Sequence, residues 1–194
     1  MPEILRDAVL IAATLTTGLM AGVFGIYSNA IMPGLRRTDD RTFLASFQSI
    51  DRAIINPAFM ATFLGALVLT AVATLLHLGD GRGLLPWIVA ALILYFVVFV
   101  VTIRVNVPRN NEIKAAGDVD RTTDLHGVRE RFNEIKWVRW NHLRAFASIL
   151  ALGLLCWALI QSGQTLGSTS TARLRRLRFA ENFTPAEPAD SSYA

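Results

Sequence analysis

The chain has only one cysteine among its 194 residues, Cys156, which lies inside an apolar run. No intrachain disulfide is possible, and we expect a buried, unreactive thiol. Cysteine and histidine never occur together at metal-ligand spacing, and neither a glycine-rich phosphate loop nor a nucleophile elbow is present. His77 and His142 are expected at opposite ends of the molecule, which argues against bis-histidine haem ligation. We therefore expect neither a metal nor a cofactor.

Charge is scarce as well, at 18% of residues against 53% hydrophobic ones, and the mean hydropathy is +0.41. The apolar residues form long uninterrupted runs, which predict an integral membrane protein with lipids as its neighbours. The interiors of these runs contain no acidic or basic residue, which argues against an ion-coupled transporter. The net charge of +4 is small, and no aromatic–basic module accompanies it, so nucleic acid is not expected as a partner.

The predicted fold class is all-α: an antiparallel four-helix transmembrane bundle formed by residues 1–162. The expected spans are residues 8–31, 57–78, 84–103 and 143–160. The GDGRG sequence at 79–83 predicts a tight turn between the second and third spans. Residues 163–194 are small, polar and basic, and we expect them to form a disordered tail.

Amphipathic interfacial helices are predicted in the first and third connections. In the first, Phe43 and Phe47 belong to an apolar stripe at helical spacing. In the third, a helix is expected to resume near Asp124 and to continue without a break into the fourth span. Pro33 and Pro108 are expected to end the first and third spans.

Most basic residues lie in the connections 32–56 and 104–142, which share one side of a four-span protein. Positive-inside counting therefore favours the cytoplasm for both connections, whereas the basic residues after the fourth span argue for the opposite orientation. The expected localisation is integral to a membrane, and we take it to be a bacterial plasma membrane.

Amides, aromatic rings and one arginine gather where these connections meet the spans. Helices that alternate in direction bring the exits of spans one and three level with the starts of spans two and four. The polar and indole residues expected at this end are Asn29, Asn56, Asn106, Asn110, Trp137, Trp140, Asn141, His142 and Arg144.

Two interpretations of this end remain open. In one, the asparagines cap helix ends and Arg144 extends to lipid headgroups. In the other, the side chains line a polar pocket roofed by the connections, since a charge and amides at that depth need partners. Asp51, Glu112 and Glu134 are the possible partners of Arg144.

Four motifs at these positions resemble the anthrone oxygenase-like family of small four-span membrane proteins, much of which is a domain of unknown function. They are SNAIMPGL at 28–35, INPAF at 55–59, TIRVNVPRN at 102–110 and WVRWNHLR at 137–144. The resemblance covers about residues 10–160. It implies a cofactor-independent monooxygenase that converts a flat polycyclic phenolic ketone to a quinone with oxygen.

The resemblance also suggests roles for individual residues. Arg144, Asn141 and Asn106 are expected to bind the oxyanion, and His142 or Asp51 to accept the proton. Stacking on the substrate is expected from Tyr95, Phe99, Trp137 and Trp140, with Asn29, Asn56 and Asn110 completing the binding site. The competing hypothesis is a non-catalytic partner subunit or lipid-binding scaffold, whose asparagines only cap helices and enclose no pocket.

Overall fold

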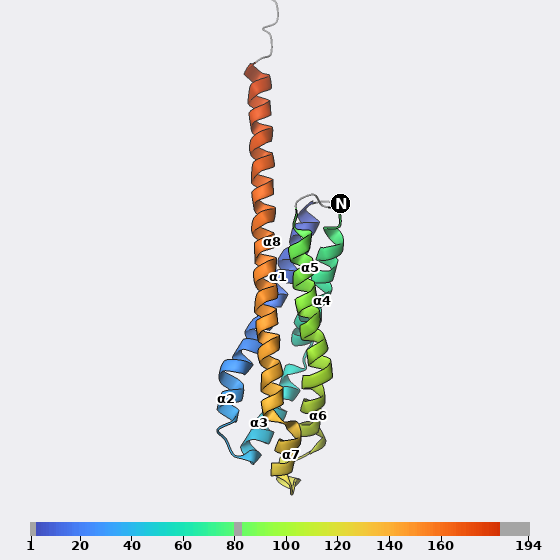
Figure 1. The fold of residues 1–194 in the computed structure, drawn as a ribbon, viewed down its shortest axis with the longest axis vertical. Coiled ribbons are helices and arrows are strands. Elements are labelled where there is room, and N and C mark those ends of the chain that lie inside the picture. The colour runs from blue at the N-terminus through green and yellow to red at the C-terminus, as the bar shows by residue number, and fades with distance from the viewer. Residues whose placement is uncertain (1–2, 80–82, 183–194) are drawn as a thin grey trace, which may run out of the picture.

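Four long helices run side by side in the computed structural model, which describes residues 3–79 and 83–182 (Figure 1). The elements are α1 (Glu3–Ile26), η1 (Tyr27–Ile31), α2 (Met32–Leu35), α3 (Asp40–Ile54), α4 (Pro57–Leu76), α5 (Leu85–Val101), η2 (Thr102–Asn106), α6 (Val107–Ala115), η3 (Val119–Arg121), α7 (Leu125–Phe132) and α8 (Glu134–Asn182). Within the described ranges all regular structure is helical, which confirms the predicted all-α class.

Four apolar segments are long enough to cross a membrane, and consecutive ones run in opposite directions (Figure 1). They are Glu3–Leu35, Pro57–Leu76, Leu85–Ala115 and Leu125–Gln164. In the bundle α1 packs against α4 and α8, and α5 packs against α8 and α4. Several alanines of the bundle helices are buried, and small side chains let the backbones approach closely, as is common in membranes. The protein is therefore an integral membrane four-helix bundle.

Pro33 and Pro108 do not end their helices, so this part of the sequence prediction was wrong. Each proline follows a five-residue π-helical turn, η1 or η2, after which the helix continues. Proline has no N–H, and its ring collides with the carbonyl four residues earlier in a regular α-helix. The wide turns shift the pairing: Met32 N–H donates to the Tyr27 carbonyl, and Val107 N–H donates to the Thr102 carbonyl. Because of this shift, the first and the third span both continue as helices beyond their prolines.

The two long connections fold into a cap over one end of the bundle, built from α3, α6, η3 and α7 (Figure 1). Its core contains Phe43, Phe47 and Phe132, all buried, together with Trp137 from the start of α8. The Phe47 and Phe132 rings meet edge to face with centroids 4.8 Å apart. The apolar stripe of α3 therefore packs at Phe43 and Phe47 against protein. The position of α3 at the membrane interface stays a prediction.

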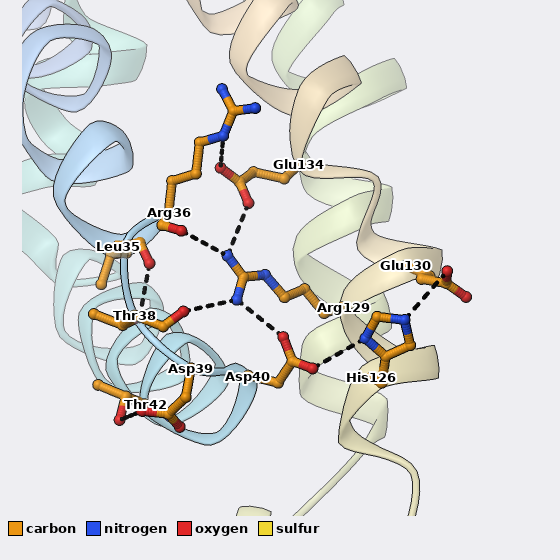
Figure 2. A network of polar contacts seen from close by, with 10 residues as sticks. All are labelled: Leu35, Arg36, Thr38, Asp39, Asp40, Thr42, His126, Arg129, Glu130 and Glu134. Carbon is orange, nitrogen blue, oxygen red and sulfur yellow. Dashed lines mark hydrogen bonds and ion pairs between the residues drawn. The ribbon is translucent and has the colours of Figure 1, made fainter.

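Arg129 of α7 links the first connection of the cap to the start of α8 (Figure 2). Its guanidinium donates to the carbonyls of Thr38 and Arg36 at 3.0 and 3.3 Å, and it bonds Asp40 and Glu134 at 2.9 and 3.2 Å. It also lies 4.2 Å from the centre of the Phe43 ring. One side chain thus ties the α2–α3 loop to the junction between α7 and α8.

α7 and α8 are separate helices, whereas the sequence predicted one continuous helix from Asp124. The break is Asn133, whose φ of 53° is left-handed, a conformation that asparagine tolerates better than most residues. Its side-chain oxygen then accepts from the backbone N–H of Lys136 at 3.1 Å and starts the new helix. The break also changes the helical phase, so Ile135 is 74% exposed instead of sharing the buried face of Phe132.

α8 extends well past the other three helices and is helical through Asn182 (Figure 1). The sequence predicted a disordered tail from residue 163, whereas α8 includes residues 163–182. A helix can continue this far because no proline interrupts the chain between Glu134 and Pro185. Residues 183–194 of that predicted tail lie outside the described residues.

Cys156 is exposed on α8, so the expected buried thiol was also wrong. α8 turns Leu155 and Ala158 into the core, both fully buried. Cys156 follows Leu155 directly, so it faces outward.

Candidate functional site

A cavity of about 270 Å³ lies where the cap meets the bundle. Its walls come from α1, η1, α3, α4, η2, α6 and α8, so distant parts of the chain all contribute. The side chains that line it are Val23, Phe24, Tyr27, Phe47, Ile50, Asp51, Ile54, Ile55, Phe59, Met60, Phe63, Thr102, Ile103, Asn106, Val107, Asn110, Lys114, Trp137 and Arg144. Its size is just below the range for small-molecule sites, which begins at about 300 Å³. A mostly apolar and aromatic wall with a few polar groups suits a flat aromatic ligand.

Arg144 provides a buried positive charge in this wall and is only 6% exposed. Its guanidinium donates to Thr102 Oγ1 at 3.2 Å and to Asn141 Oδ1 at 2.7 Å. The charge also lies over two aromatic rings, 4.5 Å from the centre of Phe24 and 5.4 Å from that of Trp137. None of the carboxylates in the described residues pairs with it, and its Nε has no hydrogen-bond partner there. Neutral groups therefore hold the cation in place.

Asn141 fixes Arg144 from behind the cavity wall. Its amide nitrogen donates to the Phe24 carbonyl at 3.0 Å and to Ser28 Oγ at 2.7 Å, which leaves its oxygen to accept from Arg144. Asn141 is fully buried. The amide thereby links α1 and η1 to the arginine and sets the direction of the guanidinium.

Asn106 places a second incompletely paired polar group in the wall. Its side chain is 1% exposed, and its nitrogen reaches the Trp137 carbonyl at a long 3.4 Å. Its oxygen has no partner among the described residues. Buried polar atoms are normally paired, so this acceptor and the free Nε of Arg144 mark a place for a polar ligand group.

A network around Asp51 forms the cap side of the cavity. Lys114 Nζ lies 2.7 Å from one oxygen of Asp51, and Asn110 Nδ2 donates to the other at 2.7 Å. The Asn110 oxygen in turn accepts from the Trp137 indole N–H at 2.8 Å. Among the described residues that line the cavity, Asp51 is the one carboxylate.

One side of the cavity is bordered by exposed apolar side chains. Ile55 and Met60 belong to the corner between α3 and α4, and Ile103 and Val107 belong to η2 and α6. Their exposed fractions are 56%, 36%, 47% and 37% respectively. We call these four residues the apolar mouth.

The structure brings several of the predicted site residues together at this cavity. Arg144, Asn106, Asn110 and Trp137 line it, and Asn141 lies directly behind Arg144. Tyr95 is fully buried deeper in the bundle, where its hydroxyl donates to the Phe63 carbonyl at 3.1 Å. Phe99 stacks on Phe63 with ring centres 5.8 Å apart. Tyr95 and Phe99 thus support the lining residue Phe63 and do not line the cavity themselves.

Four predicted residues lie away from the cavity. Asn29 is exposed on η1, and Trp140 is half-buried without lining it. Asn56 is exposed and caps α4, accepting from the Phe59 N–H at 3.0 Å, as the capping interpretation expected. His142 is exposed in a separate groove on the other face of α8. Within the described residues no cluster of metal-ligating side chains occurs.

The prediction did not include Phe24, Tyr27 or Lys114, which also form the wall. Phe24 and Tyr27 lie in an otherwise apolar span, and nothing in their spacing distinguishes them from lipid-facing aromatics. Lys114 lies six residues beyond Pro108, so its position depends on the π turn, which has no simple sequence signature.

Together, the fold and the site define a class: a four-span membrane protein whose cap and helix ends enclose a cavity around a buried arginine. Residues 50–154, more than half of the chain, match the family described as anthrone oxygenase. The chain belongs to this family. No curated protein and no solved structure shows significant similarity to it. The matched region contains three of the four motifs and most of the cavity wall.

Proposed function

We propose that the protein is a cofactor-independent oxygenase that converts a polycyclic phenolic ketone to the corresponding quinone in the membrane. The observation that carries this proposal is Arg144, a buried cation at the cavity wall whose partners in the described residues are all neutral. Such a group favours an anion in the cavity, because a buried charge without a counter-charge is costly. A ketone that becomes an enolate or phenolate on losing a proton supplies that anion during the reaction.

The chemistry needs a base, an oxyanion site and molecular oxygen. Asp51 accepts a proton from the methylene carbon, and the electron pair delocalises onto the ketone oxygen next to the Arg144 guanidinium, while the free Asn106 oxygen accepts a hydrogen bond from a phenol hydroxyl of the substrate. The anion passes one electron to oxygen, and the two radicals join in a carbon–oxygen bond, which gives a peroxide. Asp51 returns its proton to the peroxide anion. Loss of the second methylene proton to Asp51 and cleavage of the O–O bond then leave the new carbonyl and expel hydroxide, which takes up that proton and leaves as water. One oxygen atom ends in the quinone and the other in water.

Of the two bases that the sequence left open, His142 and Asp51, this proposal assigns the role to Asp51. The His142 side chain lies in another groove, whereas Asp51 lines the cavity. The competing scaffold hypothesis expects a solid polar plug at this end of the bundle, so the cavity of about 270 Å³ supports the enzyme. The apolar mouth supports a lipophilic substrate. We further propose a plasma-membrane location with both cap connections in the cytoplasm, supported by their basic residues.

The test is quinone formation from a hydroxylated anthrone by the purified full chain in lipid nanodiscs. The rate is measured above spontaneous autoxidation in empty nanodiscs. We expect Arg144→Ala to lower the catalysed rate by about 10²–10³-fold, as loss of an oxyanion donor does in other enzymes. Asp51→Asn tests the base in the same assay.

Arg104→Ala is the matched control, because Arg104 is exposed on η2 and does not line the cavity. Thermal unfolding of each variant separates lost chemistry from lost folding. A wild-type rate equal to autoxidation would remove the proposed activity. A folded Arg144→Ala variant with full activity would remove the assigned role of Arg144.

A further inference from the structure

A second, wider groove of about 830 Å³ lies on the other side of the contact between η1–α2 and α8. It shares no lining residue with the cavity around Arg144. The side chains that line it are Ser28, Met32, Pro33, Arg36, Arg37, Glu134, Ile135, Val138, Arg139 and His142. We call it the arginine groove.

The groove carries more positive than negative charge. Its one carboxylate among the described lining residues, Glu134, is already bonded to Arg129 at 3.2 Å and lies 4.0 Å from Arg36. Arg37 and Arg139 are exposed and make no side-chain hydrogen bond or ion pair with any described residue. Two unpaired guanidiniums facing one groove favour an anionic group between them.

We infer the depth of the groove in the membrane from a buried cluster to which α4 and α8 both contribute. Phe63 of α4 and Ala145 of α8 belong to the same buried cluster. Pro57 lies six residues before Phe63, and Arg139 lies six residues before Ala145, each about 9 Å along its helix toward the cap. α4 starts at Pro57 and has 20 residues, which is about the length needed to cross the hydrocarbon core. Arg139 therefore lies at the edge of the hydrocarbon, where headgroups begin.

The same groove has an apolar side. Met32, Pro33 and Val138 line it, and Ile135 is 74% exposed there. An inorganic anion makes no apolar contact with such a surface, whereas an amphiphile at this depth covers the surface with the first part of its acyl chains.

We propose that the arginine groove is a binding site for one anionic phospholipid, with its phosphate held by Arg37 and Arg139. The glycerol and upper acyl chains then cover Ile135 and Val138. This site is independent of the proposed oxygenase activity, because the two sites share no lining residue.

The test is lipid binding to the purified full chain in mild detergent, followed by native mass spectrometry and by thermal unfolding. The probes are phosphatidylglycerol, phosphatidylcholine and inorganic phosphate. We expect phosphatidylglycerol to bind best and to raise the unfolding temperature. The double variant Arg37→Gln/Arg139→Gln should bind it roughly 30-fold more weakly, since a basic side chain at a lipid surface contributes about fivefold in affinity.

Arg104→Gln is the matched control, because Arg104 is exposed, lies at the same depth and is outside the groove. It should keep the affinity of the wild type. An equal loss in Arg104→Gln, or equal binding of phosphatidylcholine, would overturn the site. Inorganic phosphate that matches phosphatidylglycerol in stabilisation would also overturn it, since that result indicates a free-anion site.

Discussion

At the scale of single residues, Arg144 is a buried cation without a carboxylate partner among the described residues. A guanidinium this buried normally pairs with a carboxylate, because desolvating a charge costs several kcal/mol. Here an amide, a hydroxyl and two aromatic faces take the place of that carboxylate. Such partners hold the cation without neutralising it. The arrangement is costly for stability alone and becomes favourable when an anionic ligand occupies the cavity.

Asp40 is the residue whose titration should affect the stability of the cap. Its hydrogen bond from Arg129, and next its contact with His126, hold the pKa of this carboxyl below its usual range. A carboxyl with a lowered pKa stabilises the folded state above its unfolded pKa. That contribution disappears as the pH falls through the folded pKa, below about pH 4.

We therefore expect Asp40→Asn to lower the free energy of unfolding by about 1–2 kcal/mol at neutral pH, because a charged hydrogen bond is lost. The difference from the wild type should shrink at acidic pH, where Asp40 is protonated in both states of the wild type. Thermal unfolding in detergent across pH measures both effects. Glu112→Gln is the control, since Glu112 is exposed and unpaired among the described residues. A gap that stays constant down to pH 3 contradicts this account.

Spacing in the sequence was enough to predict that part of α8 which forms and supports the cavity wall. Trp137, Asn141 and Arg144 recur at three and four residues, and all three are buried on one face of α8. Their neighbours Trp140 and His142 were included in the predicted site because of their residue type and not because of their angular position on the helix. Successive helical residues lie about 100° apart, so the residues flanking Asn141 face away from the cavity.

At the scale of elements, the two π turns decide which residues reach the cavity. Each adds a residue to one helical turn and so rotates the next helical segment away from the direction it would take in a regular helix. After η2, this rotation carries Asn110 to Asp51 and the indole of Trp137. Proline was visible in the sequence, but its usual interpretation is a helix end. The alternative, a wide turn that preserves the helix, depends on packing against α3 and α8 and has no local signature.

We expect Pro108→Ala to damage the site more than the fold. Alanine restores a backbone N–H and removes the ring clash, so η2 can relax to a regular α-helix and turn Asn110 away. Misplacement by about 1 Å can cost on the order of 10²-fold in rate, and we expect a loss of about 10–100-fold in quinone formation. The indole N–H resonance of Trp137 should also shift in NMR spectra, because its acceptor moves.

Pro86→Ala provides the matched control for this variant. Pro86 lies in the first turn of α5, where the N–H has no partner in the helix, so its loss should change neither quantity. Helix content from circular dichroism should be the same in both variants. An unchanged Trp137 resonance in Pro108→Ala would show that the proline does not maintain the π turn.

At the scale of the whole molecule, the sequence predicted the bundle because long apolar runs are a strong signal. The cap was less predictable, because an amphipathic helix such as α3 can bury its apolar face in lipid or in protein. Phe43 and Phe47 became core residues because α7 supplies Phe132 against them. The cap then closes the cavity on the side away from the hydrocarbon and leaves the apolar mouth as its open side.

The apolar mouth lies at a depth that makes lipid the route to the cavity. Phe63 and Val98 belong to one buried cluster, and Met60 and Ile103 lie three and five residues nearer the cap than these two residues. At about 1.5 Å per residue, Met60 and Ile103 are both nearer to this cluster along their helices than Pro57 is. If α4 crosses the hydrocarbon from Pro57, both side chains therefore lie on the hydrocarbon side of its edge. We therefore expect the substrate to enter sideways from the acyl chains and not from the aqueous side of the cap.

Narrowing the mouth with Met60→Trp and Ile103→Trp should slow turnover several-fold for substrate supplied in liposomes. Phe96→Trp should not, because Phe96 is exposed on α5 and does not line the cavity.

A labelling experiment tests the same route independently of catalysis. The natural Cys156 is removed as Cys156→Ser, and the new thiol of Ile103→Cys is then labelled. Because a lipid-facing thiol is reached through the bilayer, a membrane-soluble maleimide should react faster than a permanently charged thiosulfonate. Equal labelling by the charged reagent would mean that water reaches the mouth, and access from the aqueous side would replace access from lipid.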